Sequence, residues 1–132
     1  MIMKCKGQSA AEFLTFVGLA FIAVILFAVA SANEAKEFRD TKEFLLIKDL
    51  ALKLQREVIA AATAEDGYER SFTLPEELEN AFDYFMVIGN TTLTINSSKS
   101  VFSVAVPGTS GKNFTKGINK VEKADGIVYI NR

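Results

Sequence analysis

The stretch FLTFVGLAFIAVILFAVASA, residues 13–32, contains twenty consecutive residues without a charge. At 1.5 Å per residue, a helix of this length spans about 30 Å, which matches the hydrocarbon thickness of a bilayer. The run makes the first third of the chain too apolar for an ordinary globular fold. It predicts a membrane-spanning helix.

A short segment with two lysines precedes this run and ends in a carboxylate. Lys4 and Lys6 precede Gly7, and Glu12 stands directly before the apolar run. A carboxylate at that boundary is costly in lipid unless it has a partner. Glu12 is therefore a candidate for a specific pairing.

Three interpretations fit this N-terminus. The first is a single transmembrane anchor. The second is a secretory signal, because the small residues Ala30 and Ala32 precede Asn33, as signal peptidase prefers. The apolar run is longer than a usual signal sequence, however, and Glu12 lies at its edge. The third is a leader, residues 1–7, that is removed ahead of the apolar segment.

The segment KGQSAAEFL, residues 6–14, resembles the processing site of archaeal type IV pilins, whose leaders are cut between Gly and Gln. The residues that carry the resemblance are Lys6, Gly7, Gln8, Ser9, Glu12 and Leu14. We prefer the third interpretation because this motif lies directly upstream of an apolar run and close to residue 1. The resemblance implies cleavage between Gly7 and Gln8 by a membrane-embedded prepilin peptidase. It also implies partnership with copies of the chain or related pilins, and with a pilus assembly platform in the membrane.

The resemblance assigns roles in assembly to the first helical turns. Glu12 is expected to meet the N-terminal amine of a neighbouring subunit, which cleavage creates at Gln8. Pairing opposite charges offsets part of the cost of burying them and favours one register. Phe13 and Phe16 are expected contacts in the filament core. The alternative for Glu12 is a side chain that reaches water at the membrane surface.

From residue 33 to residue 66 the composition changes to that of an amphipathic helix. Its apolar residues recur at helical spacing, which predicts one buried face; they are Phe44, Ile47, Leu50, Ala51, Leu54, Val58 and Ala61. Asp49, Lys53 and Glu57 form an i, i+4 charge ladder. Gly67 is expected to cap the end of the helix.

Residues 67–132 are expected to form a β-rich head. Short alternating segments predict strands in ERSFTL, DYFMVIG, TTLTIN, SVFSVAV, KVEK and IVYI. Gly89-Asn90 and Ala124-Asp125-Gly126 predict hairpin turns. PEELENA is expected to be a loop or a single helical turn, and GTSGKNFTKG is expected to be a loop. The predicted fold class is α+β, with a long N-terminal helix, residues 8–32 and 33–66, packed against a small antiparallel sheet as in type IV pilins.

Composition argues against an enzyme. The chain has no histidine and one cysteine, Cys5. Zinc sites built on His and Cys, and Ser-His or Cys-His catalytic pairs, are therefore excluded. The formal net charge is −1 without a basic stripe, so nucleic acid is not an expected partner. The acidic group Glu76, Glu77 and Glu79 is expected to be solvated. We expect no catalytic residues, no metal and no cofactor.

The head contains two further features that bear on function. Three N-x-S/T sequons begin at Asn90, Asn96 and Asn113, and all are expected at turns or loops where a glycan can be carried. Four lysines gather near the C-terminus of the sequence, which is typical of a solvated basic face and less so of an adhesive patch; they are Lys112, Lys116, Lys120 and Lys123.

These features lead to one functional hypothesis and one alternative. The hypothesis is a structural subunit of an extracellular type IV pilus-like filament, with surface attachment as the expected role. Its precursor would lie in the cytoplasmic membrane with the head outside, before assembly at the cell surface. The alternative is a single-pass membrane protein with a small extracellular binding domain, which would keep residues 1–7.

Overall fold

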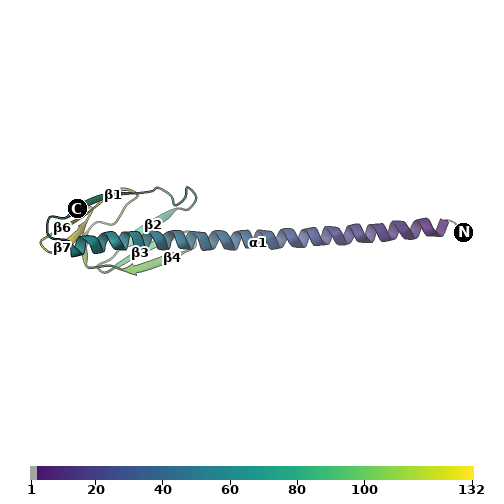
Figure 1. The fold of residues 1–132 in the computed structure, drawn as a ribbon, viewed down its shortest axis with the longest axis horizontal. Coiled ribbons are helices and arrows are strands. Elements are labelled where there is room, and N and C mark those ends of the chain that lie inside the picture. Colours follow the sequence, from purple (N-terminus) through teal and green to yellow (C-terminus); the bar gives the residue numbers. More distant parts are fainter. Residues whose placement is uncertain (1–2) are drawn as a thin grey trace. The chain divides into compact units, whose positions relative to one another are not determined.

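A computed structural model describes residues 3–132, with side chains from Gly7 onward. Residues 1–2 of the predicted leader lie outside the described residues. The chain divides into two units, residues 1–39 and residues 40–132. One helix, α1 (Met3–Thr63, 61 residues), contributes to both units, and all strands belong to the second (Figure 1).

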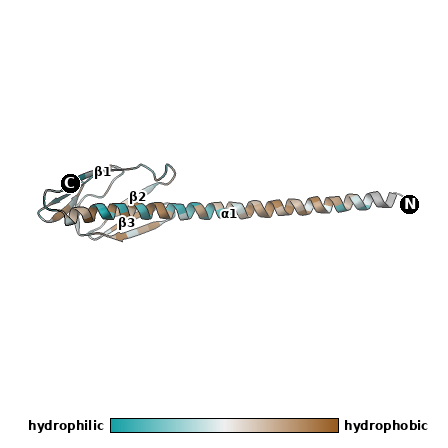
Figure 2. Ribbon diagram, viewed as in Figure 1, coloured by the Kyte–Doolittle hydropathy of each residue, from teal (hydrophilic) through white to brown (hydrophobic). Residues whose placement is uncertain are grey.

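In the first unit the described part of α1 is uncovered, and it is apolar over residues 13–32. No proline occurs before Pro75, and Gly18 is the single glycine between Gly7 and Gly67, so nothing in the sequence ends the helix early. Over residues 13–32 the ribbon is coloured mostly as hydrophobic (Figure 2). Its large side chains are exposed at every described position except Val17, which is half-buried.

The second unit contains seven strands in two sheets. The strands are β1 (Glu69–Leu74), β2 (Tyr84–Ile88), β3 (Thr92–Ser97), β4 (Val101–Ala105), β5 (Thr109–Gly111), β6 (Gly117–Ala124) and β7 (Ile127–Ile130). One sheet has the order β1-β6-β7-β5 and the other has the order β2-β3-β4. The α+β class is confirmed, with one long helix packed against a small β structure that is largely antiparallel.

The sheets correct the expectation of a single antiparallel sheet. Residues 109–111, expected to be loop, form β5, which pairs with β7 in parallel. β5 is three residues long and has no alternating apolar pattern, so its sequence contains no strand signal. The other strand pairs are antiparallel, and all six predicted strand segments are confirmed.

Both predicted hairpin turns are confirmed. Gly89 and Asn90 lie between β2 and β3, where the Gly89 N–H donates to the Thr92 carbonyl at 2.7 Å. Asp125 and Gly126 link β6 to β7 with φ of 53° and 77°. Two consecutive positive φ values are the geometry of a type I′ turn, which favours Asp-Gly at these positions.

The core lies between residues 40–63 of α1 and the inner faces of the sheets. Its helical side chains are those predicted from the 3.6-residue period, namely Ile47, Leu50, Ala51, Leu54, Val58 and Ala61. The strands add alternating residues such as Leu93 and Ile95, both fully buried. Phe44 was predicted to join this core but is 39 % exposed, because it lies at the rim, where its ring meets Phe102 edge to face.

The end of α1 differs from the prediction. The helix ends at Thr63, and Gly67, with φ of 98°, lies in the following turn, where the Tyr68 N–H donates to the Glu65 carbonyl at 3.2 Å. The ammonium group of Lys123 on β6 donates to the carbonyls of Ala62 and Ala64, each at 2.8 Å. A lysine from a distant strand therefore satisfies one carbonyl in the last turn of the helix and one just beyond it, in place of the predicted glycine cap.

Candidate functional site

The predicted processing and assembly residues lie on successive turns of α1. The structure places Gly7, Gln8 and Glu12 within the helix, and the Gln8 Nε2 donates to the Glu12 Oε1 at 3.4 Å. This exposed contact is long for a hydrogen bond. Among the side chains described from Gly7 onward, Glu12 forms no ion pair. Among the described side chains, the polar neighbour of the Glu12 carboxylate is Gln8.

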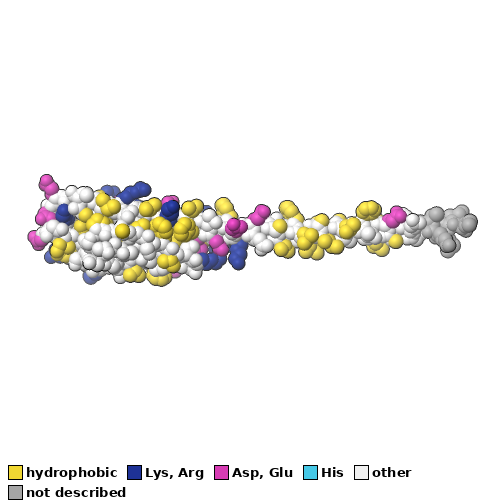
Figure 3. Space-filling model, turned by 90° about the horizontal axis from the view of Figure 1, so that it is seen from below, with side chains coloured by type: hydrophobic (Ala, Val, Ile, Leu, Met, Phe, Trp, Pro, Cys, Tyr) yellow, Lys and Arg dark blue, Asp and Glu magenta, His cyan; other side chains and the backbone are white. Residues whose placement is uncertain are grey.

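The phenylalanines that follow Glu12 form an uncovered apolar surface. Phe13 is 66 % exposed and Phe16 is 71 % exposed. The same holds for the apolar residues that follow, including Phe21 and Phe27. Hydrophobic side chains lie along this part of α1 in the space-filling view (Figure 3). A helix with apolar residues all round requires an apolar environment, either lipid or other helices.

By length and composition, α1 is the one described helix that is long and apolar enough to cross a membrane. The uncharged run ends at Ala32, and charged residues begin at Glu34. Apolar length, a basic segment before it and a polar segment after it are the features expected of a membrane anchor.

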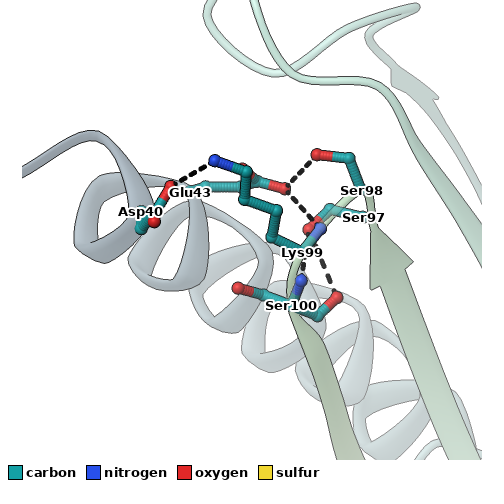
Figure 4. Close-up of polar contacts among 6 residues, drawn as sticks. All are labelled: Asp40, Glu43, Ser97, Ser98, Lys99 and Ser100. Atoms are coloured by element: carbon teal, nitrogen blue, oxygen red, sulfur yellow. Dashed lines mark hydrogen bonds and ion pairs between the residues drawn. The ribbon is translucent and has the colours of Figure 1, made fainter. Parts of the chain in front are cut away.

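A buried carboxylate ties α1 to the strands in the second unit. Glu43 is only 2 % exposed, and its Oε1 accepts hydrogen bonds from the Ser98 hydroxyl at 3.0 Å and the Lys99 N–H at 3.2 Å (Figure 4). One turn earlier, Asp40 forms an ion pair with the Lys99 ammonium at 2.8 Å. The turn between β3 and β4 is thus held by two acidic residues of the helix.

The electrostatics of Glu43 favour its charged form. Burial raises the pKa of the Glu43 carboxyl. Hydrogen bonds from Ser97, Ser98 and the Lys99 backbone outweigh burial and hold this pKa below its ordinary value, with help from the Lys99 charge. The sequence contained no signal for this role, because Glu43 lies next to Phe44 on the helix and 55 residues from Ser98.

The three sequons lie in different surroundings. Asn90 is exposed in the turn between β2 and β3, as predicted. Asn113 is also exposed, in the loop before β6, and its Oδ1 accepts a hydrogen bond from the Ile88 N–H at 2.9 Å. Asn96 was predicted at a turn but lies in β3, paired with both β2 and β4, and is half-buried. Asn90 is therefore the most accessible acceptor.

The four lysines of residues 112–123 do not form one basic face. Lys116 pairs with Asp83, Lys120 pairs with Glu69 at 3.1 Å and Glu122 at 3.0 Å, and Lys123 caps α1. The expected shared face is wrong because strand pairing brings acidic residues and helix carbonyls beside lysines that are close in sequence. Lys112 is left in the loop after β5.

Other predicted polar features are also resolved. Glu76, Glu77 and Glu79 are exposed, and Glu79 pairs with Lys42 of α1. Within the predicted ladder, Glu57 pairs with Arg70 of β1 at 3.3 Å, and the described residues show no Asp49–Lys53 ion pair. Among the described residues, no three His, Cys, Asp or Glu side chains are grouped to hold a metal ion.

Comparisons with known protein families, with curated protein sequences and with solved structures find no match to this chain.

Proposed function

We propose that this chain is a structural subunit of an extracellular type IV pilus-like filament. The observation that carries the proposal is the exposed apolar segment of α1, which begins one residue after Glu12 and six after Gly7. In a bilayer this surface contacts lipid. In a filament the same surface contacts the helices of other subunits, so the hydrophobic contribution changes little between the two states.

The proposed processing step supplies the partner for Glu12. Cleavage between Gly7 and Gln8 by a prepilin peptidase creates an α-amine one helical turn before the Glu12 carboxylate. Between subunits, the amine of one copy and the carboxylate of the next then neutralise each other in the apolar core. The compact unit that follows is carried to the filament surface, where attachment is its proposed role.

Intact mass of the chain, isolated from membranes and from sheared filaments, tests this proposal. We expect the mass of residues 8–132, with the leader and both of its lysines removed, so that 13 basic residues (15 less 2) face 16 acidic ones. Gly7→Val should retain the leader, because a branched side chain replaces the small residue at the cleavage site. Ser9→Ala, just beyond the bond, serves as the matched control.

Two other masses would contradict the proposal. An N-terminus at Asn33 would identify a secretory signal and remove the apolar segment from the mature chain. A chain that keeps residues 1–7 in the membrane and never enters filaments would identify a single-pass membrane protein. The three products differ in mass, so this measurement separates the three interpretations of the N-terminus.

A further inference from the structure

A cleft lies in the second unit between the turn of one sheet and the edge of the other. Its volume is about 330 Å³, and it is lined by Ile88, Gly89, Asn90, Thr109, Ser110, Gly111 and Lys112. The volume is at the lower end of the range for small-molecule sites.

Hydrogen bonds fix the two walls of the cleft relative to each other. The Thr109 N–H donates to the Asn90 carbonyl at 3.2 Å, and the Ile88 N–H donates to the Asn113 Oδ1 at 2.9 Å. The Lys112 N–H donates to the Ile130 carbonyl at 2.8 Å, which holds the β5 wall against β7. The cleft is therefore part of the folded structure and does not depend on a ligand to form.

The lining of the cleft is mostly polar, with one basic residue and no acidic residue. Its lining residues include Lys112, Thr109, Ser110 and Asn90, and none of them is an Asp or a Glu. In the described part of the chain, Lys112 forms neither an ion pair nor a side-chain hydrogen bond, unlike Lys116 and Lys120. Small-molecule pockets are usually lined mainly by apolar and aromatic groups, and this one is not. Its occupant should therefore be polar and anionic.

The geometry points to a binding site for a carboxylated sugar, such as a uronic acid unit of an acidic polysaccharide. The carboxylate would meet the Lys112 ammonium in a charge-assisted hydrogen bond. The sugar hydroxyls would meet Thr109, Ser110 and Asn90, whose groups both donate and accept hydrogen bonds. The site belongs to the folded monomer, so it does not depend on filament assembly.

Titration of the isotope-labelled full chain with glucuronate, glucose and acetate tests the site. The protein is made without glycosylation, because Asn90 lines the cleft, and is kept in a zwitterionic detergent without a sugar headgroup. We expect saturable amide shifts at Ser110, Gly111 and Lys112 with glucuronate, with a dissociation constant in the millimolar range. Glucose and acetate should each bind at least about threefold more weakly than glucuronate, because glucose lacks the carboxylate and acetate lacks the sugar hydroxyls.

Two lysine variants distinguish binding in the cleft from a general effect of positive charge. Lys112→Gln should weaken glucuronate binding about three- to tenfold, and Lys53→Gln, an exposed lysine on α1, should leave it unchanged. If Lys112→Gln fails to fold, Ser110→Glu provides the same test, since it places a like charge against the ligand. Equal binding of glucose and glucuronate, absence of shifts at the cleft, or equal losses in both lysine variants would overturn the proposal.

Discussion

At the scale of single residues, two carboxylates on α1 have opposite surroundings. Glu12 is exposed, and the described side chains give it no cationic partner. Glu43 is almost fully buried and accepts hydrogen bonds from the turn between β3 and β4. Glu12 is therefore available for contacts with other molecules, whereas Glu43 stabilises the fold of its own chain.

Glu12→Gln should block filament formation without blocking membrane insertion. If the proposed pairing holds, the variant leaves the amine of a neighbour unmatched in an apolar core, and breaking such a buried pair costs about 3–5 kcal/mol. Insertion should be unimpaired, because an amide is cheaper in lipid than a carboxylate. We expect processed subunit in membranes and few filaments, read by immunoblot and electron microscopy. Glu34→Gln, another exposed glutamate of α1, is the control, and normal filament numbers in Glu12→Gln would exclude the pairing.

Glu43→Gln should change how stability depends on pH. Because the folded state lowers the pKa of Glu43, its contribution is present above the unfolded pKa of about 4.3 and is lost as pH falls through the lower folded value. We expect Glu43→Gln to lower the free energy of unfolding by about 1–3 kcal/mol at pH 7. Below that pH, the free energy of unfolding should fall less steeply in the variant than in the parent chain. Urea unfolding at several pH values, followed by circular dichroism, measures both. Glu77→Gln, at an exposed residue, should retain the wild-type profile.

At the scale of elements, β5 depends on one glycine. Gly111 has φ of 108°, and a Cβ built on it would lie 2.3 Å from the Ile130 carbonyl oxygen. The Ile130 backbone cannot move away easily, because the parallel pairing of β5 with β7 places it opposite Gly111. The short parallel edge of this sheet therefore depends on the absence of a side chain at residue 111.

Gly111→Ala should destabilise the second unit by at least about 2 kcal/mol, through both the strained φ and the contact with Ile130. Gly108→Ala is a closely matched control, because a Cβ there meets nothing within 4 Å and its φ is not in the left-handed region. That variant should stay within about 0.5 kcal/mol of the parent chain. Thermal or urea unfolding measures the difference, and equal effects of the two variants would contradict this account of β5.

At the scale of the whole molecule, one unit has a core and the other has none of its own. Residues 40–132 bury helical side chains against two sheets, whereas the described large apolar side chains of the first unit are exposed. Residues 40–63 of α1 supply an essential part of that core, because Ile47, Leu54 and Val58 are fully buried. The helix and the strands of the second unit therefore form one folding unit.

A fragment of residues 33–132 should be soluble and show mixed α and β circular dichroism, because it retains the core-forming part of α1. A fragment of residues 67–132 keeps every strand but loses the helical side of the core. Exposed apolar sheet faces should make this shorter fragment aggregate. Size-exclusion chromatography distinguishes the two. Disorder in the longer fragment, or a soluble folded state in the shorter one, would show that the helix is not required.

Features that depend on local period and turn chemistry were predictable from the sequence. The buried stripe of α1 follows the 3.6-residue period, Leu93 and Ile95 follow the two-residue period, and Asp125-Gly126 is a turn sequence with the geometry that it favours. In each case the relevant residues lie within a few positions of one another, so the chain carries the signal locally.

Features that depend on distant pairing were missed. Glu43 and Ser98 are 55 residues apart, and Lys123 reaches a helix carbonyl 61 residues earlier. The division into two sheets also depends on which strands meet, and a segment as short as β5 has no pattern of its own. The roles proposed for Glu12 and its neighbours depend on contacts with other chains, which no single sequence displays.

The order of strands in the larger sheet has a consequence for synthesis of the chain on the ribosome. β5 pairs only with β7, and β1 pairs only with β6, so neither has its neighbour until later residues have emerged. At about 5–20 residues per second, the 67 residues from the end of α1 to the end of β7 take about 3–13 seconds to synthesise. During that interval the apolar face of residues 40–63 is open to other newly made chains.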